Sequence, residues 1–500
     1  MNTPIRRVSM VVIVMIIVLL ANATYIQVFK ADALKSDPRN NRVLLDEYSR
    51  QRGAITAGGE VIAVSVPTDS RLKFLRSYPP EGAEAFAPVT GYFSYQYGST
   101  EVERYENSFL SGSDDRLFGQ RFTDMFSGRD PRGGNVVTTI NPRLQRVAYN
   151  QMRNGCNGGC RGAVVAIAPN TGKILAMVST PSYDPNKLAS HDQSVRETAW
   201  SSWNDPNGSE PMLNRAINQL YPPGSTFKVV TSASALRAGV SPDVRLTAAS
   251  QFPLPDTTIS LPNYGGETCP GSSGGTVSMV TALKYSCNTA FADLVTNKMP
   301  DATSNFKDAA RRFGLDEAGP EIPMPVAKST VGEIPDRAAL AQSAIGQRDV
   351  RLTPLENAMI AATVANGGVR MQPYLVDKLQ SADLRTLSTT QPTTINEPIT
   401  SDQAATLTSM MVESERATAG AGGPVSIASK TGTAEHSDTS AGGDSETPYS
   451  WYIAFGPSSN PQIAVAVIVE NGDYGVNSVG GTVAAPIGRA VINSLVGGGR

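Results

Sequence analysis

The sequence predicts an α/β (α+β) domain with one antiparallel sheet and a helical block, preceded by a smaller, mostly β module and one transmembrane helix. The first observation is a pair of apolar, strand-like runs at residues 163–167 and 174–178, separated by a Pro-Asn-Thr-Gly turn. The second is a helix-rich stretch that begins at Ser225 and ends near Gly368. The third is the return of strand-like runs at 425–433, 449–455 and 463–470, followed by a helical run at 484–495. We expect strands at both ends of the helix-rich segment to pair in one sheet.

A chain of 500 residues is too long for one compact core, so we expect more than one domain. Residues 31–155 are polar, with short apolar runs and turn signals such as Gly58-Gly59, which predict a small β-rich module. We therefore divide the chain into a tail and transmembrane anchor at 1–30, a first module at 31–155, and a larger domain at 156–500.

The N-terminal segment predicts export. Arg6 and Arg7 precede an apolar run that, with its mildly polar end, reaches about 20 residues, enough to cross a bilayer. The alternative is a cleaved signal peptide, because Ala21-Asn22-Ala23 has the small-x-small form of a cleavage site. Both interpretations place the rest of the chain outside the cytoplasm.

Composition excludes several classes of function. The formal net charge is -2 without a long basic run, which argues against a nucleic-acid partner. The two histidines, His191 and His436, stand in no metal-ligand pattern and have no evident Asp and Ser partners. We therefore expect neither zinc chemistry nor a Ser–His–Asp triad, and we predict no metal and no cofactor.

The four cysteines favour disulfides, because an even number in an exported chain usually pairs. Cys156 and Cys160 lie in a glycine-rich turn that could close a very small loop, and Cys269 and Cys287 would then pair across a longer one. The sequence leaves three pairings open, as well as four free thiols. A zinc site made of all four is disfavoured, because only the first pair has ligand spacing.

The segment Ser225-Thr226-Phe227-Lys228 follows Pro-Pro-Gly, so we expect Ser225 to lie at the start of a helix. Residues i and i+3 share a helix face, so the Lys228 amine can reach the Ser225 hydroxyl. Lysine can remove the serine proton if burial or a nearby cation lowers its pKa. The same Ser-x-x-Lys pattern recurs at residues 70–73 and 304–307, where we expect ordinary solvated positions.

A second motif, Ser286-Cys287-Asn288, stands between two helix-like stretches. A hydroxyl placed here can shuttle a proton between the lysine and a leaving group, and a carboxamide can hold Lys228 or bind a substrate peptide bond. Similar Ser-x-Asn patterns occur at 202–204 and 458–460, so the motif alone is weak.

A third motif, Lys430-Thr431-Gly432-Thr433, lies inside a strand-like run, and Lys-Thr-Gly occurs once in the chain. A cation with two hydroxyls at a strand edge suits a substrate carboxylate. Glycine allows close approach of a substrate backbone, and the N–H groups of Thr433 and Ser225 could together form an oxyanion hole. Taken alone, a basic residue before Thr-Gly predicts only a strand end.

In this order, on a predicted helix, loop and strand, the three motifs are the signature of penicillin-binding proteins and serine β-lactamases. The chain resembles the transpeptidase domain of class B (monofunctional) penicillin-binding proteins and, more narrowly, the actinobacterial penicillin-binding protein A group. The segments that carry the wider resemblance are 214–228, 346–347, 352–354 and 430–435, and those that carry the narrower one are 44–53 and 130–135. Many class B proteins have an Asp-Arg-Asn-Gly-like turn where this chain reads Ala-Gly-Gly-Glu at 57–60, and the role of that turn is left open.

The resemblance implies a peptidoglycan D,D-transpeptidase. Ser225 would attack the penultimate D-Ala of a stem peptide, the terminal D-Ala would leave, and the amine of a neighbouring stem would take the acyl group. Lys228 and Ser286 would handle protons, and β-lactams would acylate Ser225. The resemblance also names the residues that would hold the substrate: Asn288, Lys430, Thr431, Gly432 and Thr433.

Partners follow from the same resemblance. They are peptidoglycan stem peptides, β-lactam antibiotics and a membrane glycosyltransferase of the shape, elongation and division family. Residues 31–155 would be a non-catalytic pedestal or dimerisation module.

Four alternatives stay open at this point. A β-lactamase is disfavoured because the Glu-x-x-Leu-Asn pattern at 210–214 precedes Ser225 rather than following Ser286. A D,D-carboxypeptidase differs only in passing the acyl group to water. A bifunctional glycosyltransferase is disfavoured by the short region before Gly162. A non-enzymatic β-lactam sensor would keep the same motifs.

Overall fold

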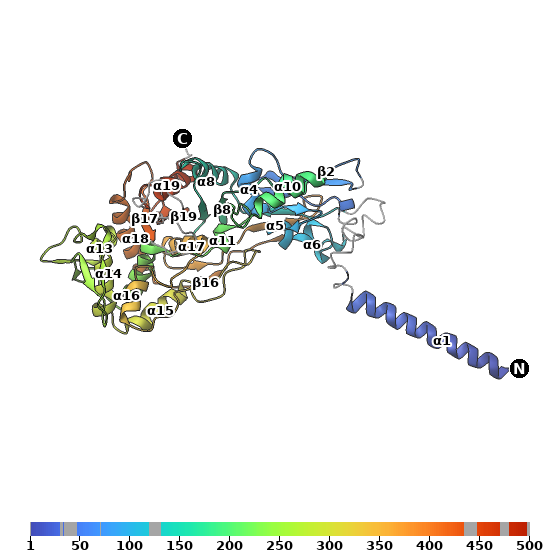
Figure 1. The fold of residues 1–500 in the computed structure, drawn as a ribbon, viewed down its shortest axis with the longest axis horizontal. Coiled ribbons are helices and arrows are strands. Elements are labelled where there is room, and N and C mark those ends of the chain that lie inside the picture. Colours follow the sequence, from blue (N-terminus) through green and yellow to red (C-terminus); the bar gives the residue numbers. More distant parts are fainter. Residues whose placement is uncertain are drawn as a thin grey trace.

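The computed structural model of the chain describes residues 2–30, 34, 48–70, 72–119, 132–434, 448–470 and 480–497. Some residues singled out in the sequence lie outside these ranges: Glu435, His436, residues 44–47, Arg71 and residues 130–131. In Figure 1 the described part forms an elongated body from which a single helix projects.

The projecting helix is α1 (Asn2–Thr24), extended by the π-helical turn η1 (Tyr25–Phe29). The helix from Thr3 to Phe29 has a mean hydropathy of 2.4, and none of its most apolar stretch is buried against the rest of the protein. By length and composition it can cross a membrane.

The larger domain is built on a five-stranded sheet with the strand order β17-β18-β19-β7-β8. Every neighbouring pair is antiparallel. The strands are β7 (Gly162–Ile167), β8 (Ile174–Thr180), β17 (Ala428–Ala434), β18 (Tyr449–Gly456) and β19 (Ile463–Val469). Both chain ends of the domain therefore pair in one sheet, which confirms the predicted hairpin, late strands and sheet closure.

Helices cover both faces of this sheet, which is why its strands are apolar on both sides. In Figure 1, α8 (Pro142–Asn154) and α19 (Ala484–Val496) lie on one face, and α17 (Pro354–Ala365) lies on the other. The Thr353 hydroxyl caps α17 by accepting a hydrogen bond from the Glu356 amide. Pro354 is the first residue of the helix, a position that suits proline because its missing N–H is not needed there. The predicted helix at 484–495 is confirmed, and α17 lies at the end of the helix-rich stretch predicted between Ser225 and Gly368.

A helical block lies at the end of the body away from α1 (Figure 1). Its helices are α12 (Lys228–Arg237), α13 (Met279–Lys284), α14 (Asn288–Asp293), α15 (Ala302–Arg312) and α16 (Arg337–Ser343). The longer α18 (Ser401–Arg416) starts at a capping box of Thr400 and Gln403 and packs along β17. The strand β17 forms one edge of the sheet, and this edge faces the helical block.

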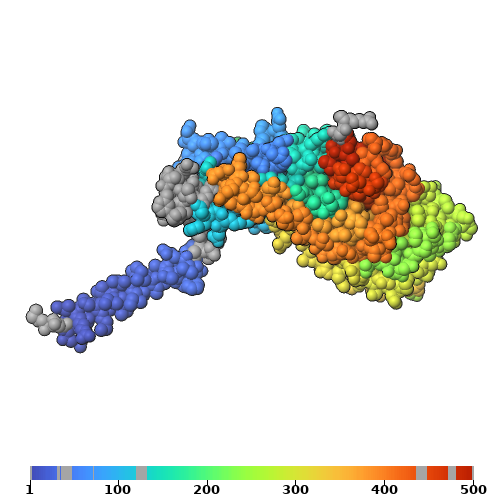
Figure 2. Space-filling view, turned by 180° about the vertical axis from the view of Figure 1, so that it is seen from behind, coloured from blue at the N-terminus to red at the C-terminus, as the bar shows by residue number. Residues whose placement is uncertain are grey.

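The second sheet has six strands in the order β15-β14-β6-β1-β2-β3. Its strands are β1 (Ile55–Ala57), β2 (Glu60–Pro67), β3 (Phe74–Ser77), β6 (Asn135–Thr138), β14 (Val376–Gln380) and β15 (Thr386–Thr389). The strand β14 pairs antiparallel with β6, so that Gln380 lies opposite Asn135. In Figure 2 the orange residues of this segment lie against the blue and cyan N-terminal part. The division at residue 155 stays a prediction, and this sheet takes strands from both sides of it.

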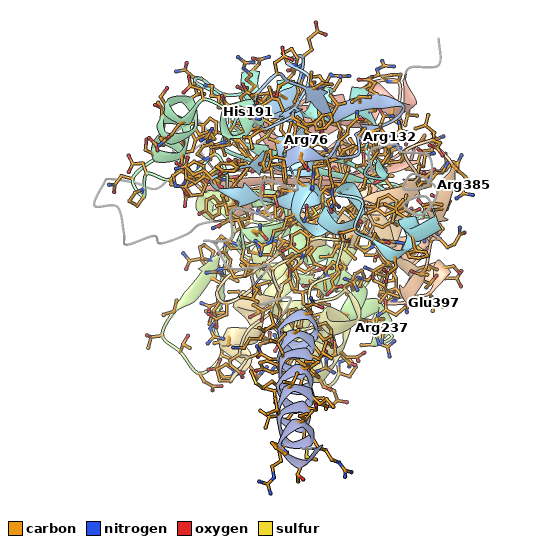
Figure 3. The ribbon with its side chains drawn as sticks, turned by 90° about the vertical axis from the view of Figure 1, so that its right-hand side faces the viewer. Arg76, Arg132, His191, Arg237, Arg385 and Glu397 are labelled. Atoms are coloured by element: carbon orange, nitrogen blue, oxygen red, sulfur yellow. A yellow bond between two sulfur atoms is a disulfide. The ribbon has the colours of Figure 1, made fainter. Side chains whose placement is uncertain are left out.

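The N-terminal module also contains helices, α4 (Ala83–Thr90), α5 (Glu101–Tyr105) and α6 (Asn107–Leu110). Glu103 is fully buried and lies 2.6 Å from both Arg52 and Arg76, which is labelled in Figure 3. Burial would raise the pKa of Glu103, but the two guanidinium groups outweigh it and hold this pKa below its ordinary value. The module is therefore held from inside by a buried ion triad.

Shorter elements complete the fold. The remaining helices are α9 (Pro185–Ala189), α10 (Gln193–Trp203) and α11 (Arg215–Asn218). The short ladders are β4 (Phe93–Ser94) with β5 (Gly98–Ser99), β9 (Leu246–Thr247) with β12 (Thr276–Val277), β10 (Gln251–Pro253) with β11 (Ser260–Pro262), and β13 (Arg370–Met371) with β16 (Thr394–Asn396).

Candidate active site

A cleft of about 1150 Å³ lies between the edge strand β17 and the helical block. Three segments that are far apart in the sequence contribute to its lining: the turn at Ser225, the α13–α14 connection at Ser286, and β17 at Thr431 and Thr433. The structure thus brings the three motifs singled out in the sequence to one place.

Ser225 lies in a 3₁₀ turn (Gly224–Phe227) that leads directly into α12, whose first residue is Lys228. The sequence predicted an α-helical start here, whereas the structure places the serine one tight turn earlier. In a 3₁₀ turn the side chains at i and i+3 eclipse each other, so this geometry aligns Ser225 with Lys228. The serine is partly exposed to the cleft, and the lysine is fully buried beneath it.

The turn packs closely against β17 because both chains have a glycine at the contact, Gly224 in the turn and Gly432 in the strand. Gly224 has φ +52°, and a Cβ on it would lie 2.7 Å from the carbonyl oxygen of Thr433. A Cβ on Gly432 would lie 2.8 Å from the carbonyl oxygen of Pro223. The backbone before Ser225 therefore runs against β17, and the segments that carry the Ser225 and Thr433 amides meet at this contact.

The Lys228 amine has four polar contacts. Its Nζ lies 2.7 Å from the Ser286 carbonyl oxygen, 2.6 Å from Asn288 Oδ1, 3.0 Å from Ser225 Oγ and 3.3 Å from Ser286 Oγ. Asn288 Nδ2 donates to the Pro262 carbonyl oxygen at 3.0 Å, so Oδ1 is the atom that faces the lysine. A neutral amine has two N–H donors, which the carbonyl and carboxamide oxygens occupy, and its lone pair is left for the serine hydroxyl.

Electrostatics favour the neutral amine. Burial holds the pKa of Lys228 well below its ordinary value, and the positive charge of Lys430 lowers it further. Among the residues that the structure describes, no carboxylate lies within hydrogen-bond distance of Lys228. Lys228 is therefore suited to accept the Ser225 proton near neutral pH.

Ser286 stands between the two lysines. It has a left-handed backbone conformation (φ +61°), and its Oγ lies 2.9 Å from Lys430 Nζ as well as 3.3 Å from Lys228 Nζ. Burial lowers the pKa of Lys430 to about 7. Lys430 is buried behind the cleft lining, and its Nζ also donates to the Thr431 carbonyl oxygen at 2.9 Å. Thr431 and Thr433 line the cleft in front of it.

The α13–α14 connection is tied to the loop that follows β11. Cys269 and Cys287 form a disulfide, and Cys156 and Cys160 form the other, so the pairing matches the one favoured in the sequence analysis. The described residues include no free cysteine. Cys287 lies between Ser286 and Asn288, so the disulfide joins this motif directly to a loop that lines the cleft.

The sequence does not reveal the groups that support the Ser225 turn. Arg215 is fully buried and its Nε lies 3.1 Å from Glu470, and the Tyr221 hydroxyl donates to the same carboxylate at 2.5 Å. Trp451 Nε1 donates to the Pro222 carbonyl oxygen at 2.9 Å. These contacts fix residues 221–222 to β18 and to the end of β19. Nothing in the sequence around Glu470 indicates that it is the shared partner of Arg215 and Tyr221.

A second buried carboxylate lies behind β17. Glu415 of α18 accepts hydrogen bonds from Ser429, from the Tyr452 hydroxyl at 2.9 Å and from Arg489 at 2.7 Å. Ser429 precedes Lys430, so this network holds the strand from which Lys430 projects.

The remaining motif copies lie away from the cleft. Ser70 is exposed and donates to the Leu72 carbonyl oxygen. Its Oγ lies 3.2 Å from Nδ1 of His191, which stands between α9 and α10 and is labelled in Figure 3. Ser304 is exposed on α15. Glu210 pairs with Arg161 at 2.9 Å and does not line the cleft. Within the described ranges, no three His, Cys, Asp or Glu side chains gather as metal ligands.

Comparisons with known proteins find matches over most of the chain. The family described as "Penicillin binding protein transpeptidase domain" matches residues 162–493, and "Penicillin binding protein A dimerisation domain" matches residues 52–136. The chain is 55% identical over 494 residues to the peptidoglycan D,D-transpeptidase PbpA of Mycolicibacterium smegmatis, covering 98% of both chains. It is 54% identical to PbpA of Mycobacterium tuberculosis over the full length of both.

Solved structures match as well. The ceftriaxone acyl-enzyme complex of penicillin-binding protein A from M. tuberculosis superimposes with a TM-score of 0.86 at 53% identity, covering 90% of this chain and 99% of that one. The penicillin G acyl-enzyme complex gives 0.84 at 52% identity, covering 90% of this chain and 100% of that one.

Proposed function

The chain belongs to the penicillin-binding protein transpeptidase family and is a peptidoglycan D,D-transpeptidase, and we propose that Ser225 is its nucleophile and Lys228 its general base. The observation that carries the proposal is the lysine's hydrogen bonding. The Ser286 carbonyl oxygen and Asn288 Oδ1 lie where they can accept both N–H groups of a neutral amine, which leaves its lone pair for Ser225 Oγ, 3.0 Å from Nζ.

Acylation follows from this arrangement. Ser225 Oγ attacks the carbonyl carbon of the penultimate D-Ala, and its proton moves to the Lys228 amine. The carbonyl oxygen becomes negative and is stabilised by the N–H groups of Ser225 and Thr433, which belong to the two segments in contact at Gly224. The tetrahedral intermediate then breaks its C–N bond.

The leaving amine of the terminal D-Ala needs a proton at this stage. The Ser286 hydroxyl lies within 3.3 Å of Lys228 Nζ, so it passes a proton to the amine and regains one from the lysine. Lys430, at 2.9 Å on the other side of Ser286, keeps the hydroxyl oriented and supplies positive potential. Asn288 holds Lys228 and so positions the base.

The substrate carboxylate binds along β17. The hydroxyls of Thr431 and Thr433 contact it, Gly432 lets the backbone approach, and Lys430 adds its charge from behind the lining. A β-lactam carries a carboxylate and a reactive amide in the same relation, so it acylates Ser225 by the same route. One relative at 52–53% identity, penicillin-binding protein A from M. tuberculosis, has been solved as acyl-enzymes with two β-lactams, which supports this.

Transfer to an amine completes the reaction. The amine of a neighbouring stem attacks the ester carbon, the bond to Ser225 Oγ breaks, and one amine proton returns to the serine through Lys228. The relatives that the chain matches over its full length carry the name D,D-transpeptidase, which supports an amine rather than water as the acceptor.

The position in the cell follows from α1. We propose that the helix Thr3–Phe29 anchors the enzyme in the cell membrane as a single span and that the active site works outside the cytoplasm. The two disulfides support an oxidising compartment.

Residues 31–155 serve as a pedestal or dimerisation module, supported by the family match at 52–136. A membrane glycosyltransferase of the shape, elongation and division family supplies the glycan strands.

The deciding experiment is covalent labelling with fluorescent penicillin, followed by mass spectrometry of the labelled peptide. The wild-type chain and the Ser70→Ala and Ser304→Ala variants should label equally, and Ser225→Ala should not label. Labelling that persists in Ser225→Ala would overturn the assignment of the nucleophile.

A further inference from the structure

The loop between β11 and α13 forms a wall of the cleft and is fixed to the catalytic motif. Asn263 Nδ2 donates to the carbonyl oxygen of Glu267 at 3.0 Å, and Asn263 Oδ1 accepts from the amide of Thr289 at 3.1 Å. Two residues after Glu267, the Cys269–Cys287 disulfide makes a covalent tie to the same motif. The backbone at Glu267 is therefore held at a set position relative to Ser286 and Asn288.

Glu267 is the one carboxylate among the described residues that line the cleft. Its side chain is exposed and forms no ion pair with any residue that the structure describes. The cations of the lining have partners already: Lys284 pairs with Glu413 at 2.9 Å, and Arg348 donates to the Glu333 carbonyl oxygen. An uncompensated negative charge at this wall is available to a ligand.

The two walls of the cleft differ in charge. The β17 wall has Lys430 behind the hydroxyls of Thr431 and Thr433, and it suits the carboxylate of the acyl donor. The loop wall has Glu267, and it suits a cation. The acyl acceptor is an amine, which is protonated and therefore cationic near neutral pH until it reacts.

Exposed aromatic side chains border the same wall. Tyr264 is 65% exposed and Tyr285 is 42% exposed, and both line the cleft. A Cβ on Gly271 would lie 3.6 Å from the Tyr285 ring, so the loop packs beside that ring. Such rings offer a surface against which the alkyl chain of the acceptor amine can pack.

We propose that Glu267 binds the ammonium group of the acyl acceptor, with Tyr264 and Tyr285 contacting its alkyl chain, so that amines compete with water for the acyl-enzyme. The inference rests on the proposed function, because it needs an acyl group on Ser225. The bound ammonium first loses one proton to solvent. The neutral amine then forms the C–N bond as the C–O bond to Ser225 breaks, and its second proton passes to Ser225 Oγ.

The test compares Glu267→Gln with Glu397→Gln in the full-length protein. Glu397 is also exposed, and Figure 3 shows it on the outer surface near Arg237; it does not line the cleft. Each enzyme is given a stem-pentapeptide donor and increasing amounts of a stem peptide with a free side-chain amine. Mass spectrometry then gives the ratio of cross-linked to hydrolysed product.

We expect Glu267→Gln to lower this ratio about 3- to 5-fold at low acceptor concentration, the size of one solvent-accessible charge contact. The loss should vanish at saturating acceptor, because binding rather than chemistry is weakened. Glu267→Lys should lower the ratio further, and Glu267→Asp should restore part of it. Glu397→Gln should match the wild type.

The rate of penicillin acylation separates this inference from the proposed function. It should be unchanged in Glu267→Gln, because donor binding and Ser225 are untouched, and it also shows that the variant is folded. Equal product ratios in Glu267→Gln, Glu267→Lys and the wild type would overturn the acceptor site while leaving the nucleophile in place. Absence of penicillin labelling in the wild type would instead overturn the proposed function.

Discussion

The amide of Gly224 donates a 3.0 Å hydrogen bond to the carbonyl oxygen of Gly346, so the turn that carries Ser225 rests on the loop after α16. Gly346 has φ +74°, and a Cβ on it would lie 2.1 Å from the Gly224 carbonyl oxygen. The position of Ser225 therefore depends on a close contact between the backbones of Gly224 and Gly346, which is possible because neither residue has a side chain.

This contact predicts the effect of Gly346→Ala. The new methyl group must push the Ser225 turn away, and a displacement of the nucleophile of about 1 Å can slow a reaction about 100-fold. We expect such a loss in the second-order rate constant of penicillin acylation. Gly239→Ala is the control, because Gly239 has φ +80° but nothing within 4 Å of its Cβ position. It should lower stability by about 1 kcal/mol through strain alone and leave acylation unchanged; equal acylation rates in the two variants would contradict the argument.

Lys228→Gln should remove the base while keeping N–H donors for the Ser286 and Asn288 oxygens. We expect acylation by penicillin to fall about 10²- to 10⁴-fold, the usual contribution of a positioned general base. Stopped-flow fluorescence measures the rate. The matched control is Lys307→Gln on α15, which alters the other intact Ser-x-x-Lys copy of the larger domain and should have no effect. A Lys228→Gln rate within a factor of about 10 of the wild type would exclude Lys228 as the base.

The pH dependence of acylation should be bell-shaped. The rate rises with pH as Lys228, whose pKa burial holds well below its ordinary value, loses its proton and becomes a base. It falls as pH rises through the Lys430 pKa of about 7, because the charge that attracts the substrate carboxylate is then lost.

Lys430→Arg tests which group causes the alkaline limb, since arginine keeps its charge to about pH 12. That limb should move upward by at least about one pH unit, even if the maximal rate falls. An alkaline limb that stays in place would show that another group controls it.

Glu470→Ala should destabilise the larger domain by about 3 kcal/mol, because the buried Arg215 would lose its nearer carboxylate at 3.1 Å and keep only Glu210 at 3.7 Å. Urea unfolding measures the loss. Glu413→Ala removes a carboxylate from a surface pair with Lys284 and should cost far less. Similar losses for the two variants would contradict a special role for the Glu470 network.

The fold was predictable where the signal is local. The β7–β8 hairpin, the strands β17 to β19 and the helix α19 are marked by apolar runs and turn residues, and they appear within a few residues of the predicted ranges. The contact of Ser225 with Lys228 was predictable because the two residues are three apart on one turn.

Other features depend on residues that are distant in the sequence. The pairing of β14 with β6 joins residues about 240 positions apart, and neither strand carries a mark of its partner. Glu470 and Glu415 are ordinary acidic residues in the sequence, and only the fold surrounds them with Arg215, Tyr221, Ser429 and Arg489. The orientation of the Asn288 carboxamide likewise depends on the Pro262 carbonyl oxygen.

The shared six-stranded sheet restricts how this protein can have been assembled and how it can be re-engineered. A contiguous N-terminal cassette ending near residue 155 would leave β6 without β14 as its neighbour and would expose a bare strand edge on each fragment. Exchange of the front half between homologues by a single crossover therefore breaks a hydrogen-bonded ladder, unless the segment at 376–389 is exchanged with it. Recombination between relatives is expected to preserve these two stretches as a pair.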